Sequence, residues 1–248
     1  MSRPVVTLLT DFGLEDAYVA QLKAVILSQV PDVELVDIAH GIPPFGTLSA
    51  GWLLHTSYAF FPRGSIHLCV IDPGVGTSRR VLAVLKGGHA FVGPDNGVFS
   101  FLFPADQVIE ITWKPPGPLS STFHGRDIMA PVVAELLRYT PPQSLGRPAS
   151  KPVQIDVARD MVVHVDRFGN VVTNIEGSRL QEGCSLAVGE KKVDRIVETF
   201  AGIPSGEPAL IIGSAMTVEV AANRESAAAL LGARAGMPAK LIPPGSYE

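Results

Sequence analysis

A carboxylate and a guanidinium flank a short loop that follows one of the most apolar stretches of the chain. Asp72 directly follows residues 66–71, an apolar run that predicts a buried strand. Arg79 lies seven positions after Asp72. The loop between them contains a proline and two glycines, which allow a backbone to approach a ligand closely. Because ligands of open α/β sheets bind beyond the carboxyl ends of strands, this loop is a candidate binding site. From these residues alone, a structural turn with an exposed ion pair is an equal alternative.

Other polar side chains follow predicted strands or precede predicted helices. Asp11 follows the apolar run of residues 5–9, Asp16 lies near a helix start, and His124 precedes an apolar helix expected from residue 128. Taken alone, Asp16 is better explained as an acid at a helix N-terminus, and a lone histidine is more often structural than catalytic. Two carboxylates at a sheet edge suit ribose hydroxyls or a cationic substrate group. An arginine and a histidine can hold and deprotonate a water, so the set indicates hydrolysis of a polar small molecule.

The elements that would position these residues alternate between strand and helix in the first part of the chain. Apolar, β-branched runs predict strands at residues 5–9, 33–38 and 65–71, and helical spacing predicts helices between them. Thr47 is expected to cap the second helix. Shorter strands are expected at residues 81–85, 90–92 and 108–111. The alternation is typical of an α/β domain.

The pattern changes after a segment rich in proline, serine and glycine at residues 139–152, which predicts a linker. Beyond it, short strands separated by turns predict a small, mainly antiparallel β domain with a barrel-like fold. One helix is expected at residues 224–231, capped by Asn223. The expected domains are therefore residues 1–150 and 159–248.

Composition excludes several classes of function. The net charge is −4 and there is no basic tract, which argues against nucleic acid and anionic membrane surfaces as partners. No apolar run approaches the roughly 18 residues of a membrane span, and the N-terminal residues do not resemble a signal peptide. The two cysteines provide no disulfide framework, which suits the cytoplasm. No zinc spacing, dinucleotide loop or nucleophile elbow is present, so neither a metal nor a cofactor is expected.

Several motifs, in matching order along nearly the whole chain, resemble the S-adenosylmethionine hydroxide adenosyltransferases, which are relatives of the fluorinating and chlorinating enzymes. Each motif is weak alone, and the set is specific. The matching stretches are residues 10–16, 42–45, 72–79, 93–97, 123–127 and 166–170.

The resemblance implies that water or hydroxide attacks the ribose C5′ of S-adenosylmethionine, in line with the departing sulfur, and gives adenosine and L-methionine. It also implies an α/β/α N-terminal domain with a mostly parallel sheet, followed by a small antiparallel β-barrel. Members are typically homotrimers in which a neighbour's C-terminal domain completes the site.

The resemblance assigns roles to individual positions. Asp11 would bind the ribose hydroxyls, and Phe45 would lie against the substrate. Asp72, Arg79 and His124 match the triad of the water-using enzymes, whereas the halogenating relatives have tyrosine and threonine at the first two positions. Because arginine stays protonated, Arg79 would orient the water, and either His124 or Asp72 would take its proton.

The remaining assignments concern the other end of the substrate. Asp16, Asp166 and Ser214 would hold the methionine amino group, and Asn170 would contact the adenine. Ala215 stands where the halogenating relatives have an arginine, so the carboxylate contact differs. Two alternatives remain: a halide-using adenosyltransferase, against which a carboxylate at Asp72 argues, and a non-catalytic protein that binds S-adenosylmethionine or adenosine, which has no need of an intact triad.

Overall fold

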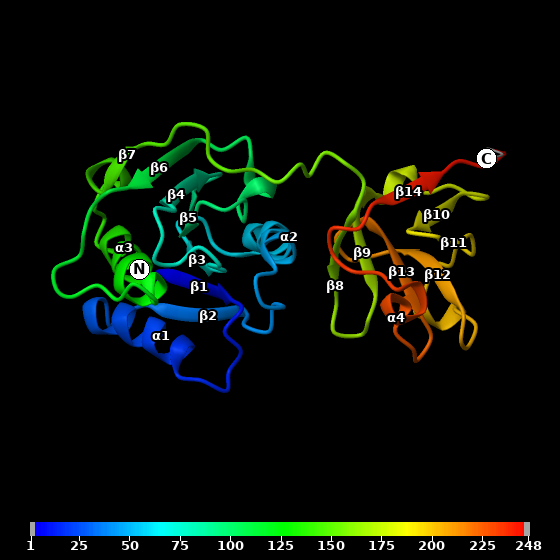
Figure 1. Cartoon of the computed structure of the whole chain (residues 1–248), viewed down its shortest axis with the longest axis horizontal. Coiled ribbons are helices and arrows are strands. Elements are labelled where there is room, and N and C mark those ends of the chain that lie inside the picture. The colour runs from blue at the N-terminus through cyan, green and yellow to red at the C-terminus, as the bar shows by residue number, and fades with distance from the viewer. Residues whose placement is uncertain (1–2, 246–248) are drawn as a thin grey trace. The chain divides into compact units, whose positions relative to one another are not determined.

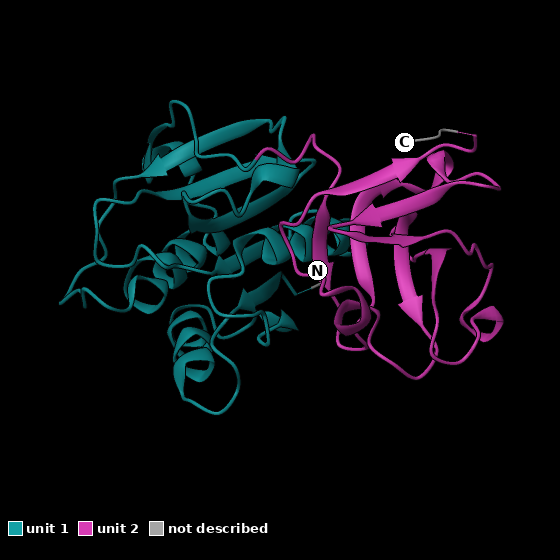
Figure 2. Cartoon of the chain, turned by 45° about the vertical axis from the view of Figure 1, so that its right-hand side comes forward, with its two compact units in different colours: residues 1–155 teal, residues 156–248 magenta. Residues whose placement is uncertain are grey.

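The computed structural model describes residues 3–245, and the chain divides into two compact units, Met1–Ile155 and Asp156–Glu248 (Figure 2). The division lies a few residues beyond the predicted linker because hydrogen bonds tie the end of that segment to the first unit. The backbone N–H of Val153 donates to Asp95 Oδ1, and that of Ile155 donates to Ser100 Oγ, each at 2.7 Å. The two units are described separately.

The first unit is built on a seven-stranded sheet in the order β2-β1-β3-β5-β4-β6-β7 (Figure 1). The first four strands in this order are parallel, and β4, β6 and β7 continue the sheet with antiparallel pairings. The strands are β1 (Val5–Thr10), β2 (Glu34–Ala39), β3 (Ile66–Val70), β4 (Val81–Lys86), β5 (His89–Pro94), β6 (Gln107–Ile111) and β7 (Gly146–Pro148).

Helices cover both faces of this sheet. Helices α1 (Tyr18–Gln29) and α3 (Ala130–Leu137) share one core cluster with the sheet, and α2 (Thr47–Ser57) belongs to another. Neighbouring residues of β1 illustrate the two faces, since Leu8 packs in the first cluster and Leu9 in the second. The prediction of an α/β first domain with helices on both faces is therefore confirmed.

Two local predictions in the first unit are wrong. Strand β7 lies inside the segment expected to be a linker, where it pairs with β6 as an edge strand, a position that tolerates its proline. Thr47 does not cap α2. The N-cap is Gly46, no side chain caps the helix, and the Thr47 hydroxyl donates to the Phe45 carbonyl at 3.4 Å.

A π-helical turn, Gly125–Met129, precedes α3 and begins three residues before the predicted helix start. His124 is its N-cap residue. A Cβ at Gly125 would lie 2.9 Å from a methyl carbon of Val70, so the close approach of this turn to β3 requires glycine.

The second unit contains two antiparallel sheets, in the orders β12-β13-β9-β8 and β11-β10-β14. One core cluster joins them, with Val171 and Val218 from the larger sheet and Leu186 and Ala239 from the smaller. The prediction of an antiparallel second domain is confirmed. Its strands are β8 (Val162–Val165), β9 (Val171–Glu176), β10 (Ser185–Val188), β11 (Lys191–Val193), β12 (Pro208–Ile212), β13 (Thr217–Ala222) and β14 (Ala239–Ile242).

The helix of the second unit, α4 (Ala227–Leu231), is shorter than predicted and has a different cap. Arg224 has a φ of 60°, which is incompatible with a right-handed helix, so Asn223 cannot be the N-cap. Ser226 caps the helix instead, and its hydroxyl accepts the N–H of Ala229 at 3.1 Å. Short 3₁₀ turns occur at Tyr58–Phe60, Ser100–Leu102, Pro142–Ser144, Gly177–Arg179 and Phe200–Gly202.

Candidate active site

A cavity of about 520 Å³ lies in the first unit, beyond the carboxyl ends of β1, β2 and β3. Four segments of the chain line it: the loops after these three strands and the segment that leads into the π-helical turn. This is the edge of the sheet where the sequence predicts a ligand. The lining residues are Asp11, Phe12, Tyr18, Pro44, Phe45, Val70, Asp72, Val75, Thr122, Phe123, His124 and Gly125.

Asp72 and His124 line this cavity, and Arg79, which is not one of the lining residues, contacts both of them. Arg79 forms an ion pair through Nη2 with Asp72 Oδ2, and the same Nη2 lies 3.4 Å from His124 Nδ1. The side chains of Asp72 and Arg79 are only 6% and 8% exposed. Asp72 Oδ1 and Arg79 Nε are buried without a hydrogen-bond partner among the described residues. The arrangement therefore holds a buried carboxylate oxygen without an aligned hydrogen bond beside a fixed cation, and the backbone N–H of Gly74 is near enough to help lower the pKa of Asp72.

Burial dominates the electrostatics of this pair. Removal from water raises the pKa of Asp72, although the positive charge of Arg79 opposes the shift. Burial likewise lowers the pKa of the Arg79 guanidinium, and Asp72 opposes that shift. A carboxylate with a raised pKa is a stronger proton acceptor than an exposed one, while the ion pair keeps it available in its charged form.

Backbone and side-chain hydrogen bonds fix the loop between Asp72 and Arg79. Arg79 donates through Nη1 to the Arg80 carbonyl at 2.7 Å, and its backbone N–H donates to Thr77 Oγ1 at 3.2 Å. Gly76 has a φ of 79°, and a Cβ there would lie 2.4 Å from the carbonyl oxygen of Ser121. Only glycine permits this approach, which brings the loop against the segment that carries His124.

Asp11 and Phe45 lie on neighbouring loops and contact each other. The backbone N–H of Phe45 donates to Asp11 Oδ2 at 2.9 Å. Phe45 has a φ of 65°, and its side chain is largely exposed at the cavity. An unfavourable backbone conformation at a non-glycine residue is common where a ligand is bound, because function selects the side chain.

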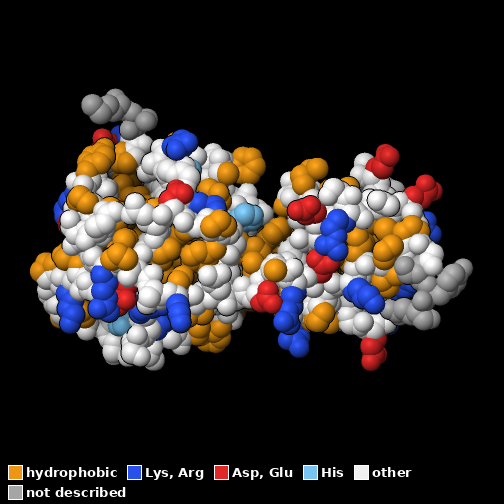
Figure 3. All heavy atoms as spheres, turned by 90° about the horizontal axis from the view of Figure 1, so that it is seen from above, with side chains coloured by type: hydrophobic (Ala, Val, Ile, Leu, Met, Phe, Trp, Pro, Cys, Tyr) orange, Lys and Arg blue, Asp and Glu red, His pale blue; other side chains and the backbone are white. Residues whose placement is uncertain are grey.

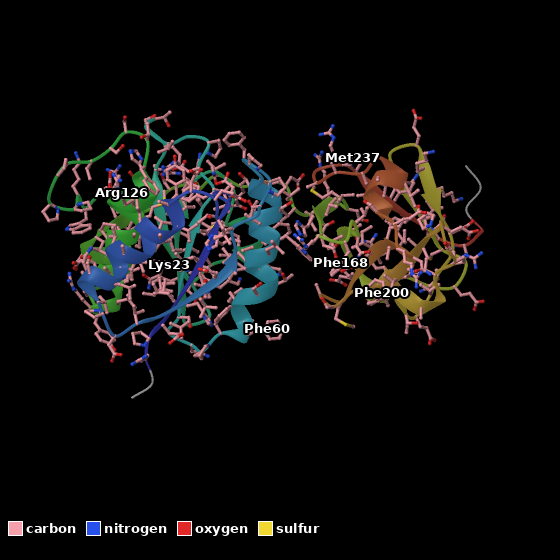
Figure 4. The ribbon with its side chains drawn as sticks, turned by 90° about the horizontal axis from the view of Figure 1, so that it is seen from below. Lys23, Phe60, Arg126, Phe168, Phe200 and Met237 are labelled. Atoms are coloured by element: carbon pink, nitrogen blue, oxygen red, sulfur yellow. The ribbon has the colours of Figure 1, made fainter. Side chains whose placement is uncertain are left out.

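Asp16 is exposed, precedes α1 by two residues and does not line the cavity. The other predicted binding residues belong to the second unit. There Asp166 organises the turn between β8 and β9 (Figure 4 labels Phe168 in this turn). Its Oδ1 accepts the backbone N–H groups of Phe168 and Asn170, both at 2.9 Å, and its Oδ2 accepts Asn170 Nδ2 at 2.8 Å. Ser214 is exposed in the turn between β12 and β13.

Glu219 on β13 is a further candidate that sequence reasoning missed. It is 8% exposed, and burial, together with the nearby negative charge of Asp166, raises its pKa to about 7. A Cβ at Gly213 would overlap the Glu219 carboxylate, so this carboxylate lies against the turn that carries Ser214. The only signal in the sequence is a glutamate among apolar strand residues, which usually indicates a solvent-facing position.

Three features of the described residues bear on other classes of function: potential metal ligands, the apolar length of the helices and the distribution of surface charge. Within residues 3–245, no group of three or more histidine, cysteine or acidic side chains has the arrangement of a metal site. None of the helices described is long and apolar enough to cross a membrane. Acidic and basic side chains are interspersed on the face drawn in Figure 3.

Models of a single protein family match both units of the chain. The SAM hydroxide adenosyltransferase N-terminal domain matches residues 6–146, and the C-terminal domain of the same family matches residues 160–240. This chain belongs to the SAM hydroxide adenosyltransferase family. The resemblance inferred from the sequence motifs is thereby confirmed.

Similarity to individual proteins, two of them named as hydrolases and one as a fluorinase, is consistent with this assignment. A protein from Thermus thermophilus named (R)-S-adenosyl-L-methionine hydrolase is 39% identical, over 97% of this chain and 100% of its own length. A Salinispora tropica protein of the same name is 35% identical, over 94% and 95%. A fluorinase from Actinopolyspora mzabensis is 25% identical, over 95% and 96%. The crystal structure of an uncharacterized conserved protein from Thermotoga maritima is 31% identical, with a TM-score of 0.87 over 96% of this chain and 100% of that chain.

Proposed function

We propose that this protein hydrolyses S-adenosyl-L-methionine to adenosine and L-methionine by in-line attack of water on the ribose C5′. The observation that carries the proposal is the contact of Arg79 with Asp72 and His124, which both line one cavity. Relatives of this chain are named (R)-S-adenosyl-L-methionine hydrolase. The sulfonium leaves as a neutral thioether, so the step needs no general acid, metal or cofactor. It needs an oriented water and an acceptor for one proton.

Asp72 is the better proton acceptor of the two candidates. Arg79 Nη2 carries only protons, so His124 Nδ1 can face it only as an acceptor, and the neutral ring then holds its proton on Nε2. In that form Nε2 donates a hydrogen bond and cannot take a proton. Asp72 keeps Oδ1 without a protein partner and has a raised pKa. Water would donate to Asp72 Oδ1, while Arg79 stabilises its developing negative charge.

The binding residues divide by the part of the substrate they contact. In this proposal Asp11 accepts the ribose hydroxyls, Phe45 packs against the substrate, and Asn170 contacts the adenine. Asp16, Asp166 and Ser214 hold the methionine amino group. Asp166 already accepts three hydrogen bonds from its own turn, and we therefore add Glu219 as a second carboxylate for this ammonium.

The proposal extends to assembly and location. The shared core cluster of the two antiparallel sheets supports a small barrel in the second unit. We further propose a cytoplasmic homotrimer in which residues 1–150 bind the adenosyl group and carry out catalysis, and residues 159–248 complete the site of a neighbouring subunit. Analytical ultracentrifugation tests the trimer, and a monomer at all concentrations would exclude it.

The decisive experiment incubates the purified protein with S-adenosyl-L-methionine in ¹⁸O-labelled water, with and without chloride or fluoride. We expect adenosine that carries the label on its 5′ oxygen, in a yield that halide does not change. Asp72→Asn, which preserves the shape of the side chain, is the matched control. A halogenated nucleoside would identify a halide-using adenosyltransferase, and tight binding without product would identify a non-catalytic binding protein.

A further inference from the structure

A bulge interrupts the pairing of β1 with β2 just before the site. Leu8 pairs with Asp37 and Leu9 pairs with Ala39, so one residue of β2 is left without a partner. Bulges bend a strand and redirect the side chains that follow, and they often occur beside active sites. His40 is the first residue after this strand, and its imidazole is directed toward β1, where Nδ1 lies 2.8 Å from Thr10 Oγ1.

The imidazole of His40 is part of a buried chain of polar contacts. Its side chain is 4% exposed, and Nε2 lies 3.1 Å from Asp37 Oδ1, a close contact that lacks the alignment of a good hydrogen bond. Asp37 Oδ2 accepts from Lys23 Nζ on α1 at 2.6 Å (Figure 4 labels Lys23). Burial opposes ionisation of Asp37, but Lys23 and His40 together hold the pKa of its carboxyl group below the ordinary value.

These contacts determine which group donates and which accepts at each step of the chain of polar contacts. The negative charge of Asp37 beside Nε2 favours the tautomer of His40 that carries its proton on Nε2, and in that tautomer Nδ1 is the acceptor. The Thr10 hydroxyl therefore donates to His40, which leaves its oxygen free to accept the backbone N–H of Phe12 at 3.3 Å. The chain of contacts ends on the loop that carries Asp11.

His40 also contacts this loop through its backbone. Its carbonyl accepts the N–H of Gly13 at 2.8 Å, so His40 anchors both sides of the segment between Thr10 and Gly13. The loop that begins at His40 returns to the same segment through the hydrogen bond from Phe45 to Asp11 Oδ2. Two loops of the cavity are thus joined at His40 and again at Asp11, although His40 does not line the cavity.

We infer that His40 is a positioning residue that, through Thr10, fixes the Asp11 carboxylate and the Phe45 backbone for binding of the ribose. The inference rests on the proposed function for the identity of the ligand. It predicts that breaking the chain of contacts at Thr10 acts on binding only through Asp11, whereas a merely structural contact would act on every ligand and every background equally.

The test is a double-mutant cycle with adenosine as the probe and calorimetry as the measurement. Thr10→Val keeps the shape but removes the hydroxyl, and Thr10→Ser keeps the hydroxyl as the matched control. We expect Thr10→Val to weaken adenosine binding by roughly tenfold in the wild-type background and to have little effect in an Asp11→Ala background. An equal loss in both backgrounds would overturn the inference.

A second readout does not depend on the ligand. Hydrogen exchange of the Phe45 and Gly13 amides should be slow in the wild type and Thr10→Ser, and at least tenfold faster in Thr10→Val. Asp37→Asn, a change at a partly exposed side chain that the fold should tolerate, should accelerate the same amides to a smaller extent. If the incubation in labelled water gives no adenosine, the proposed function fails, and the amide exchange still decides the role of His40. Unchanged exchange in Thr10→Val would refute that role.

Discussion

Arg79 engages only one oxygen of the Asp72 carboxylate. Its Nη2 pairs with Oδ2, and Oδ1, which is equally buried, has no hydrogen-bond partner among residues 3–245. An ion pair whose only purpose was stability would be expected to satisfy both oxygens, since each buried acceptor without a donor costs about 1–3 kcal/mol. We expect a substrate or a water molecule to donate the missing hydrogen bond to Oδ1.

Asp72→Asn should abolish most turnover and leave binding nearly intact. The amide retains the shape of the side chain but cannot accept a proton, and loss of a general base costs roughly 10²–10⁴-fold in rate. Single-turnover formation of adenosine measures the chemical step, and calorimetry with adenosine measures binding. His124→Gln is the informative comparison. If that variant loses more activity than Asp72→Asn, the base is His124.

The rate should fall as the pH is lowered through the pKa of Asp72. Burial raises this pKa above the ordinary carboxyl value of 3.8, so protonation of Asp72 removes the acceptor at a higher pH than an exposed aspartate would. The acidic limb of the kcat/KM profile of the free enzyme reports this group. The limb should be absent from the residual activity of Asp72→Asn, and its persistence there would assign it to another residue.

Asp11→Ala should weaken adenosine binding by roughly 10- to 100-fold, because hydrogen bonds to a charged acceptor contribute about 1.5–3 kcal/mol. The control is 2′,3′-dideoxyadenosine, which lacks the hydroxyls that Asp11 is proposed to accept. Wild type and Asp11→Ala should bind this analogue with similar affinity. A similar loss for both ligands would mean that Asp11 has no specific contact with the ribose hydroxyls.

Glu219→Gln should stabilise the ligand-free protein above neutral pH. A carboxyl group whose folded pKa of about 7 exceeds its ordinary 4.5 binds its proton more tightly in the folded state, so its contribution to stability is lost as the pH rises from 4.5 to 7. The difference between variant and wild type should be small at pH 4.5 and grow to at most about 3 kcal/mol at pH 8. Urea unfolding at the two pH values measures it, and a difference independent of pH would show that Glu219 titrates normally.

Acid should destabilise the protein through His67. This side chain is fully buried, accepts or donates a hydrogen bond with Thr7 at 2.7 Å, and has its pKa lowered by burial to about 3. The unfolded chain binds a proton below pH 6.5 that the folded chain excludes, so stability is lost as the pH falls from 6.5 toward 3.

The matched variant is His67→Asn, which keeps a polar atom near Thr7 but does not titrate. It should be less stable than wild type by roughly 2 kcal/mol at pH 7, because the smaller side chain leaves a void. By pH 4.5 the wild type should lose about 2–3 kcal/mol relative to the variant, so the deficit should vanish or change sign. A deficit that stays constant between the two pH values would exclude His67 as the titrating group.

The parts of the site that lie at strand ends could be predicted from the sequence. Asp11 and Asp72 follow β1 and β3, which are adjacent and parallel with Thr10 opposite Val70, so two apolar runs were enough to bring both carboxylates to one edge. The confirmed α/β alternation of the first unit follows from the same runs. Asp16, Asp166, Asn170 and Ser214 came from the family resemblance, and their roles remain predictions.

Other features depend on contacts that are distant in the sequence. Strand β7 has no strand-forming residues and exists because β6 offers an edge. Glu219 follows the alternation of β13, which usually turns a polar residue to water, but here it shares a face with Ala221, which is buried in a small cluster with Ile203 and Ile211. Helix propensity does not exclude Arg224 from a helix. Its left-handed backbone, with a φ of 60°, does exclude it, and the sequence does not reveal that conformation.

The π-helical turn before α3 amounts to one residue inserted into an otherwise regular helix. Such a residue turns everything before it by roughly 100° relative to everything after it. Helix α3 is fixed by its apolar residues in the core, so the turn determines which way His124 faces. Deleting a single codon within residues 125–129 would remove the inserted residue and turn His124 away from Arg79, together with Phe123, which packs in the core. One genetic step would therefore separate His124 from Arg79 and rearrange one wall of the cavity.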